Sequence, residues 1–343
     1  MKKLFLSLTL LAGLIGFNAC STDVDLYAGY KEIPVIYGLM DASADTNYVK
    51  IVRAFSGSDE VSVDATQVAL IADSCNYPGK LDAKIYRYKR IFGNEFALDD
   101  AAPVIELDTI TINDKEPGAF YYPNQRVYYT TASFTPSDDY FYRLEVVVGN
   151  DTISSETGIV GGENFKVTNS QVSFMLEDTE KTAKINFMPA DNATVYNMEV
   201  SFRYKKMVPG ESPVFKIVRY SFGMKNLDEI GTDDGILYYV TYSQNLLFNM
   251  LRADIANDPL NTSYTYDPKI SFVISLAAGG EELYNYIQIN QGAGGLSQNI
   301  PDYTNINGGY GVFSSRINIV KEVRLSARAQ SDMTSFGFAP EDF

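Results

Sequence analysis

Apolar and polar residues alternate along most of this chain, and that alternation limits the fold more than any other feature. In the stretch LDAKIYRYK, Leu81, Ala83 and Ile85 are separated by polar residues. Side chains two positions apart share one face of a β-strand, so the pattern is typical of a half-buried strand. Comparable stretches bounded by turn residues predict strands at residues 33–37, 48–54, 104–112, 126–134 and 140–148. The chain is therefore expected to be mainly β.

Length and a glycine-rich break predict two domains. A mature chain of about 320 residues exceeds what one hydrophobic core usually serves. The break GIVGGEN covers residues 158–164. We expect an N-terminal domain at residues 33–160 and a C-terminal domain at residues 161–343.

Two stretches suggest the architecture of these domains. In SDDYFYRLEVVV, Asp138 precedes Tyr142 by four residues, which resembles the corner before the sixth strand of immunoglobulin-like folds. Leu144 replaces the cysteine of true immunoglobulins, so only the architecture is similar. KTAKINF followed by ATVYNMEVSFRY has the order of the second and third strands of a fibronectin type III module. We expect Tyr196, Met198 and Val200 to share a face there, and each domain to be a β-sandwich of this kind.

The second domain is expected to carry two short helices. SQNLLFNMLRADIANDP has Ser243 as a candidate N-cap and Pro259 as a stop. A further helix is expected at residues 281–290, with acidic residues in its first turn. Both patterns favour packing against a sheet over partner binding. The stripe of the first helix comprises Leu247, Met250, Leu251 and Ile255.

The N-terminus has the three parts of a secretory signal peptide. Lys2 and Lys3 precede an uncharged apolar run that ends at Ala19-Cys20. That ending resembles the lipobox of bacterial lipoproteins, in which the cysteine is acylated and becomes the mature N-terminus. We expect a signal peptide at residues 1–19, a lipidated Cys20, and a tether at residues 20–32. The alternative is an ordinary signal peptide with an incidental cysteine.

Charge and missing residue types exclude several functions. The chain has 28 basic and 43 acidic residues, a net charge of −15, which disfavours nucleic-acid and anionic-lipid binding. It has no histidine, and acylation of Cys20 leaves only Cys75, so histidine-dependent triads and most zinc sites are excluded. Walker A and G-x-G-x-x-G motifs are absent. We expect a protein that is not an enzyme and has no cofactor or metal.

A resemblance to a family rests on three segments. LYNYIQINQ, a short glycine-rich link and YTNINGGYGVFSSR resemble the C-terminal signature of an uncharacterised family of Bacteroidetes outer-membrane lipoproteins. PVIYGLMDASADTNYVKIVRAF and EPGAFYYPNQRVYY are similar to its other shared segments. The resemblance covers roughly residues 33–316. It implies β-sandwich bodies and genes beside TonB-dependent transporters, and the family has no assigned catalytic residues.

The glycine-rich stretch at residues 292–316 is a separate feature. We expect it to form a long ordered loop.

These observations lead to one hypothesis and two alternatives. The first is a surface lipoprotein that docks on an outer-membrane β-barrel transporter and assists substrate capture or gating. The second is a stand-alone glycan-binding protein or adhesin, with Tyr121-Tyr122 or Tyr128-Tyr129 as aromatic platforms. A carboxylate-based hydrolase ranks third. Thr109 and Thr152 resemble the short acidic-Thr-apolar acceptor for O-glycosylation. The acylated cysteine is expected to insert its lipid into the bilayer of the outer membrane. The body of the protein then lies on the cell surface or on the periplasmic face.

Overall fold

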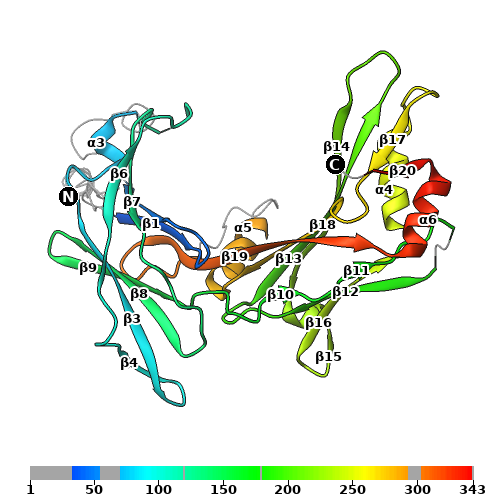
Figure 1. Ribbon diagram of the computed structural model, residues 1–343. Helices are drawn as coiled ribbons and strands as arrows, with labels where there is room; N and C mark the ends of the chain where they lie inside the picture. Colours follow the sequence, from blue (N-terminus) through cyan, green and yellow to red (C-terminus); the bar gives the residue numbers. More distant parts are fainter. Residues whose placement is uncertain (1–32, 55–69, 119, 178–179, 293–302, 342–343) are drawn as a thin grey trace, which may run out of the picture.

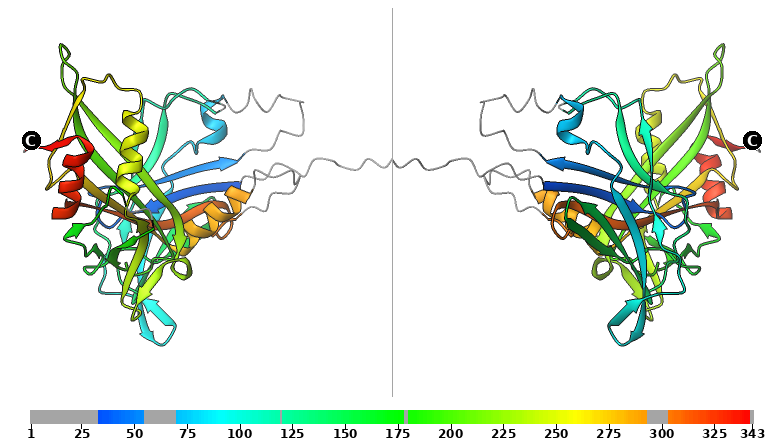
Figure 2. Two further views of the ribbon diagram at one scale, coloured as in Figure 1. Left: turned by 90° about the vertical axis from the view of Figure 1, so that its right-hand side faces the viewer. Right: turned by 90° about the vertical axis from the view of Figure 1, so that its left-hand side faces the viewer.

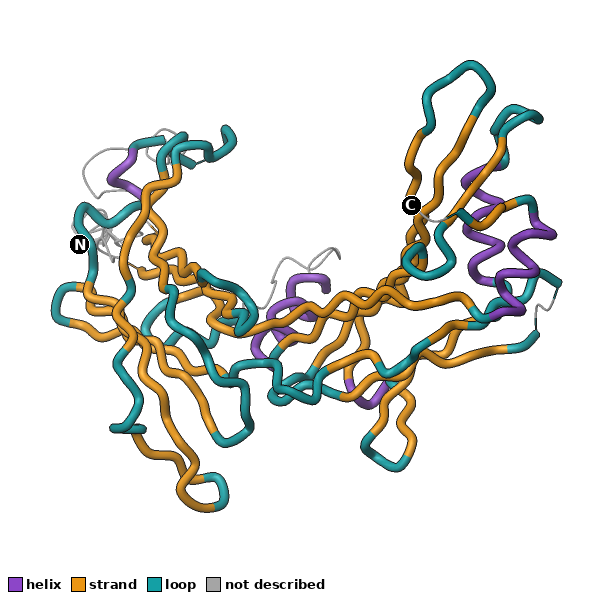
Figure 3. Tube along the Cα trace, viewed as in Figure 1, coloured by secondary structure: helices purple, strands orange, loops and turns teal. Residues whose placement is uncertain are grey.

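The structure is a computed structural model that describes residues 33–54, 70–118, 120–177, 180–292 and 303–341. The expected signal peptide, Cys20 and the tether lie outside the described residues. The protein is mainly β, with 51% strand, as the alternation of apolar residues predicts. Strands dominate both halves of the chain in Figure 3.

The strands form three sheets, the largest of which is shared by both halves of the chain. Its strands are β1 (Ile33–Met40), β2 (Asn47–Ala54), β6 (Asp108–Ile112), β7 (Gln125–Thr130), β11 (Gln171–Val172), β13 (Val195–Met207), β14 (Val214–Asn226), β17 (Ser263–Tyr266), β18 (Phe272–Gly279), β19 (Tyr310–Leu325) and β20 (Phe338–Pro340). Their order is β20-β17-β13-β18-β19-β1-β2-β7-β6, with β11 beside β19 and β14 beside β13.

Two smaller sheets and the helices complete the described elements. The five-stranded sheet contains β3 (Asp82–Phe92), β4 (Glu95–Leu98), β5 (Ile105–Glu106), β8 (Tyr140–Val148) and β9 (Asp151–Thr157). The four-stranded sheet contains β10 (Lys166–Val167), β12 (Thr182–Met188), β15 (Gly231–Asp233) and β16 (Leu237–Ser243). The helical elements are α3 (Ala72–Cys75), η1 (Leu227–Glu229), α4 (Leu246–Ile255), α5 (Glu281–Gly292) and α6 (Ala327–Phe336).

One long strand, β19, connects the two halves of the molecule. Its first part pairs in parallel with β1, from Tyr310 to Ser315. Its next part pairs antiparallel with β18, from Arg316 to Val323. Figure 1 shows two arms on either side of the middle of β19, with α5 beside the strand between them. The first arm contains β1 to β9, and the second arm contains β10 to β18, β20, α4 and α6. A single continuous strand therefore belongs to both arms.

Each arm has its own hydrophobic core, and each core lies between the large sheet and a smaller one. In the first core, Ile36 of β1 and Val49 of β2 pack with Ile85 and Leu144 of the five-stranded sheet. Phe313 of β19 belongs to this core, although it lies far along the chain. In the second core, buried residues of β13 and β18 pack with those of the four-stranded sheet and of α4 and α6. The domain division at residue 160 stays a prediction.

Most of the predicted strands are present, with two differences. The β1–β2 hairpin and strands β3 and β8 lie where the alternation predicts them. The stretch 104–112 was expected as one strand, but it is divided at the buried Leu107. The chain changes sheets at this residue, because β5 pairs with β3 and β6 pairs with β7. The stretch 126–134 forms a shorter strand that ends at Thr130.

Both predicted helices are present, but the N-cap of the first is wrong. Helix α4 begins at Leu246, with Asn245 as its N-cap, whereas Ser243 still belongs to β16 and its Oγ lies 2.7 Å from Asn245 Oδ1. A third helix, α6, escaped prediction. Its start is capped by Ser326 Oγ, and it ends at Gly337 with a left-handed φ of 100°. In Figure 2, α4 and α6 lie together at one end of the molecule, where Phe248 and Phe336 meet edge to face.

We expected a loop over residues 292–316, but the last part of this stretch is a strand. From Tyr310 onward the chain is strand β19, while residues 293–302 lie outside the described residues. Gly311 explains how the strand approaches β1 so closely. Its φ is 113°, and a Cβ atom there would lie 1.9 Å from the carbonyl oxygen of Ile36. Only glycine tolerates that conformation and that contact.

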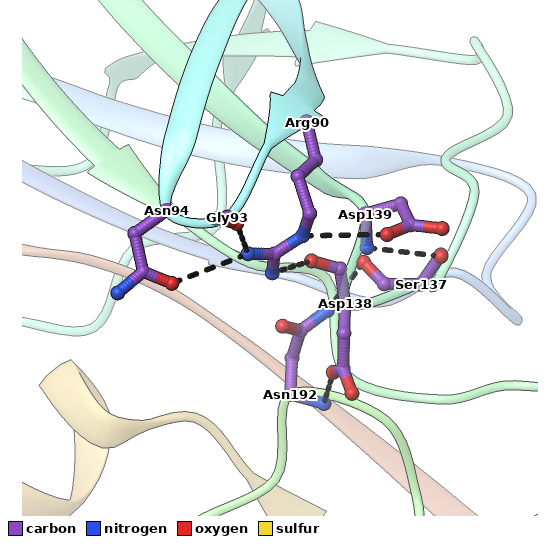
Figure 4. A network of polar contacts seen from close by, with 7 residues as sticks. All are labelled: Arg90, Gly93, Asn94, Ser137, Asp138, Asp139 and Asn192. Carbon is purple, nitrogen blue, oxygen red and sulfur yellow. Dashed lines mark hydrogen bonds and ion pairs between the residues drawn. The ribbon is translucent and has the colours of Figure 1, made fainter.

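A polar network joins the two arms beside the first turn of α5. Asn192, with a φ of 56°, follows β12. Its Nδ2 donates to the carbonyl oxygens of Ser137 (2.9 Å) and Ile159 (3.1 Å). Its backbone N–H donates to Asp138 Oδ1 (3.0 Å), and Arg90 donates to the carbonyl oxygen of Asp138 (2.6 Å). Figure 4 shows this Asn192 network. One side chain of the second arm thus fixes a loop of the first.

We predict that Gly311→Ala destabilises the protein far more than Gly210→Ala. Gly210 also has a positive φ, of 88°, but a Cβ atom there meets nothing within 4 Å. Gly210→Ala is expected to cost roughly 1 kcal/mol from backbone strain alone. Gly311→Ala must in addition separate β19 from β1, at about 3 kcal/mol or more. Denaturant unfolding measures both, and equal losses would contradict the close pairing of these strands.

We predict that Asn192→Gly lowers the free energy of unfolding by about 2 kcal/mol, because two hydrogen bonds are lost while the positive φ is still allowed. The matched control is Asn94→Gly. Asn94 belongs to the same network, but its Oδ1 lies 3.4 Å from Arg90 at an exposed position. The control is expected to change stability by about 0.5 kcal/mol or less. Similar losses in the two variants would show that Asn192 has no special role.

Candidate ligand-binding groove

The candidate site lies on the face of the large sheet that is covered in part by α5. Tyr37 of β1 is paired with Val312 of β19 on one side and with Lys50 of β2 on the other. The helix is held over β19 by two hydrogen bonds, from Leu283 N to Ser314 Oγ (3.2 Å) and from Gly280 N to the carbonyl oxygen of Ser315 (3.0 Å). Side chains of the large sheet and of α5 therefore line the same space between the sheet and the helix.

Two hollows on this face share Tyr37 and Lys50 and together form what we call the Tyr37–Lys50 groove. The first hollow, of about 510 Å³, lies between the sheet and α5. The second, of about 350 Å³, continues along β1 and β2. Both volumes are in the range of small-ligand sites. The first hollow is lined mainly by Tyr37, Tyr48, Lys50, Val127, Leu283, Tyr286, Val312 and Arg316. The second adds Val35, Val52, Arg53, Cys75, Lys115, Phe120 and Tyr121.

Aromatic side chains stand open to solvent in the first hollow. Tyr37 is 40% exposed and Tyr48 is 50% exposed. Tyr37 meets Tyr286 of α5 edge to face, with ring centroids 6.3 Å apart. Tyr48 packs against Tyr129 at 6.5 Å. Exposed rings that are held in place by other rings lose little conformational freedom when a ligand covers them.

The groove is positively charged although the protein is strongly acidic. Lys50, Arg53, Lys115 and Arg316 line it, and Asp41 is the one acidic residue among the described lining residues. Asp41 Oδ1 is already occupied, since it accepts from the N–H (2.8 Å) and the Oγ (2.6 Å) of Ser43.

Two of these cations, Lys50 and Arg316, form no ion pair with any carboxylate among the described residues. Burial lowers the pKa of Lys50, and the nearby charge of Lys115 lowers it further. The ammonium group of Lys50 is therefore held in an unfavourable environment that a bound anion would improve.

In the second hollow the cations already have protein partners. Lys115 Nζ donates to the carbonyl oxygen of Tyr121 (2.7 Å), and Arg53 lies 5.8 Å from the centre of the Tyr77 ring. Cys75 is half-buried beside them. The polar groups available for a ligand are thus concentrated near Lys50, where the two hollows meet.

Glu282 connects α5 to the first arm and to the shared strand β19. Its Oε2 accepts hydrogen bonds from Thr157 Oγ1 (3.0 Å) and Ser314 Oγ (2.9 Å), and both of these residues are buried. Burial raises the pKa of the Glu282 carboxyl above its ordinary value. The helix that covers the groove is therefore anchored at its first turn by a partly desolvated acid.

The predicted site residues do not come together in the groove. Cys20 lies outside the described residues. Thr109 is half-buried in β6 and Thr152 is exposed in β9, so they belong to different sheets. The predicted modification of both threonines stays a prediction.

The two predicted aromatic platforms lie in different environments. Tyr121 lines the second hollow of the groove. Tyr122 is exposed. Tyr128 is buried in the first core, where its hydroxyl accepts from Leu81 N (2.9 Å), so the pair Tyr128-Tyr129 is not a platform.

The sequence reasoning missed the groove residues Tyr37, Lys50 and Arg316. A weak signal was present, because Tyr37 and Lys50 occupy positions in their strands that alternate with core residues such as Ile36 and Val49. Outward aromatic and basic residues at neighbouring strand positions indicate a surface that is not simply solvated.

Three general findings bear on function. Among the described residues, no group of three or more His, Cys, Asp or Glu side chains is arranged to hold a metal ion. None of the helices in the described part of the chain is long and apolar enough to cross a membrane. No protein-family model matches the chain, and a search of curated proteins finds no similar one. The resemblance to Bacteroidetes lipoproteins therefore stays a prediction.

We predict that Glu282→Gln removes one component of the pH dependence of stability. Because the pKa of Glu282 is raised in the folded protein, folding favours its protonated form. The free energy of unfolding should then fall as pH rises from the ordinary glutamate pKa through the raised one. Unfolding by denaturant at several pH values should show this fall in the wild type and less of it in Glu282→Gln. Glu281→Gln, which removes the neighbouring exposed charge, is the control, and parallel pH curves for all three proteins would contradict the assignment.

Proposed function

We propose that this protein is an outer-membrane lipoprotein, anchored through Cys20, that captures a ligand in the Tyr37–Lys50 groove for a β-barrel transporter of the TonB-dependent class. The body is then an accessory component on the cell surface rather than an enzyme. The observation that carries the capture role is the groove itself, in which exposed tyrosines lie with two cations that have no carboxylate partner among the described residues. The anchor and the transporter rest on the N-terminal sequence and on the family resemblance.

The side chains of the groove are suited to reversible binding of a ligand rather than to a covalent reaction. Tyr37, Tyr48 and Tyr286 offer contact surface, and Lys50 and Arg316 offer charge. Among the lining residues that the structure describes, the one carboxylate is that of Asp41, and it is engaged by Ser43. General acid–base catalysis needs an acid or base positioned toward a reacting group. Binding and release are the functions for which this set of side chains is suited.

We further propose that each arm is a β-sandwich of the immunoglobulin or fibronectin III type. Support comes from the two cores, each of which lies between two sheets. The hydroxyl of Tyr142 accepts from Thr135 N (2.9 Å), which is similar to the tyrosine corner of immunoglobulin-like folds. Tyr196 makes the same kind of bond with Ala190 N (3.0 Å) in the second arm.

A stand-alone glycan-binding protein or adhesin is the second candidate. The exposed rings of Tyr37 and Tyr48 favour it, because aromatic faces are common contact surfaces for ligands. The two candidates differ in whether a transporter accompanies the protein.

We predict that the wild-type protein, pulled down in mild detergent from its native outer membrane, brings a β-barrel transporter with it, and that protease treatment of intact cells removes the body. Cys20→Ala should abolish both results, because the acyl anchor is lost. Mass spectrometry identifies the partner. If the protein comes down alone from cells whose surface protease removes its body, the transporter role is contradicted and the adhesin is favoured. Gly210→Ala, which keeps the anchor, is the control variant.

A further inference from the structure

Charge in the Tyr37–Lys50 groove is opposite to that of the whole protein. Acidic residues outnumber basic ones by 43 to 28 along the chain, yet the groove contains four basic residues and one acidic residue among its described lining. Two cations, Lys50 and Arg316, lie in one hollow without an ion pair among the described residues. Lys50 is half-buried and Arg316 is exposed. A cation that is partly buried without a counter-ion is costly, so Lys50 favours an anionic ligand, and the charge of Arg316 disfavours a cationic one.

The rest of the lining is largely apolar and sets a second requirement. Val127, Leu283 and Val312 form the floor and one wall of the first hollow. Asn47 is buried there, and its side chain is already bonded to the backbone N–H (2.7 Å) and carbonyl oxygen (3.0 Å) of Asp41. The other uncharged polar side chains of the first hollow are Thr46 and the tyrosines, and apolar surface predominates around them. The ligand must therefore combine carboxylates with apolar groups.

The division of the groove into two adjoining hollows adds a third requirement. In an extended peptide every second side chain points the same way. Two adjoining hollows that share Tyr37 and Lys50 suit two successive side chains on one face of such a peptide. Phe120 and Tyr121 line the second hollow and provide aromatic contacts there.

We propose that the Tyr37–Lys50 groove binds a short acidic peptide, whose carboxylates pair with Lys50 and Arg316 and whose apolar side chains contact the tyrosines and α5. This assignment rests on the proposed capture function and names its ligand class. The negative charge of a bound carboxylate offsets the desolvation of Lys50 and so raises its lowered pKa. Selectivity against cationic peptides follows from the same two side chains.

The test uses the full-length protein in detergent and a fluorescent tetrapeptide, Phe-Glu-Phe-Glu, measured by fluorescence anisotropy. Two further probes are the amidated Phe-Gln-Phe-Gln and an oligogalacturonate. Lys50→Met and Arg316→Gln are compared with Arg203→Gln. Arg203 belongs to the same large sheet but is paired with Glu322 (3.1 Å), so its loss changes the net charge equally without touching the groove. Thermal unfolding shows that each variant is folded.

We expect the acidic peptide to bind, and each groove variant to weaken binding about tenfold or more, while Arg203→Gln leaves it unchanged. Added salt should also weaken binding. Equal binding of the glutamine peptide, or an equal loss in Arg203→Gln, would overturn the carboxylate assignment. Binding of oligogalacturonate alone, with the same dependence on Lys50 and Arg316, would overturn the peptide assignment but leave the groove as the capture site. The capture function itself fails only if none of the three probes binds in the groove.

Discussion

The pairing of β19 with β1 is the interaction on which the rest of the structure depends. The same strand continues into the second arm and pairs with β18, so one backbone spans both cores. It also carries Ser314, which holds α5, and Arg316, which lines the groove. Groove, helix and arms are therefore positioned by one continuous ladder of backbone hydrogen bonds, and Gly311 is the residue that lets the two strands approach.

Tyrosine has two separate roles in this protein. Buried tyrosine hydroxyls accept hydrogen bonds from backbone amides that the sheets leave unpaired, such as those of Leu81, Thr135 and Ala190. Burial raises the pKa of Tyr196 to about 12, so its hydroxyl stays protonated at any physiological pH. Because a buried amide without a partner is costly, these contacts hold the loops between strands in place. The exposed rings of Tyr37 and Tyr48 have the second role, because they line the groove and are available to a ligand.

Local patterns in the sequence predicted local structure, and long-range pairing escaped them. The hairpin of β1 and β2, strand β8 and helix α5 follow from period and turn residues within short windows. The capping residues of α6, Ser326 and Gly337, were also readable but were overlooked. No window contains both β1 and β19, so neither the shared strand nor the groove was predictable. Lys50 and Arg316 are brought together only by that pairing, since nothing in the sequence near one refers to the other.

The shared strand has a consequence for how the chain folds during synthesis. The first arm begins to emerge early in synthesis, but its sheet lacks the β19 edge and its core lacks Phe313 until nearly the whole chain has been produced. Contacts between such distant segments form late, because closing a long loop costs entropy before any contact repays it. The topology that joins the two arms thereby delays completion of the first core until synthesis is nearly finished.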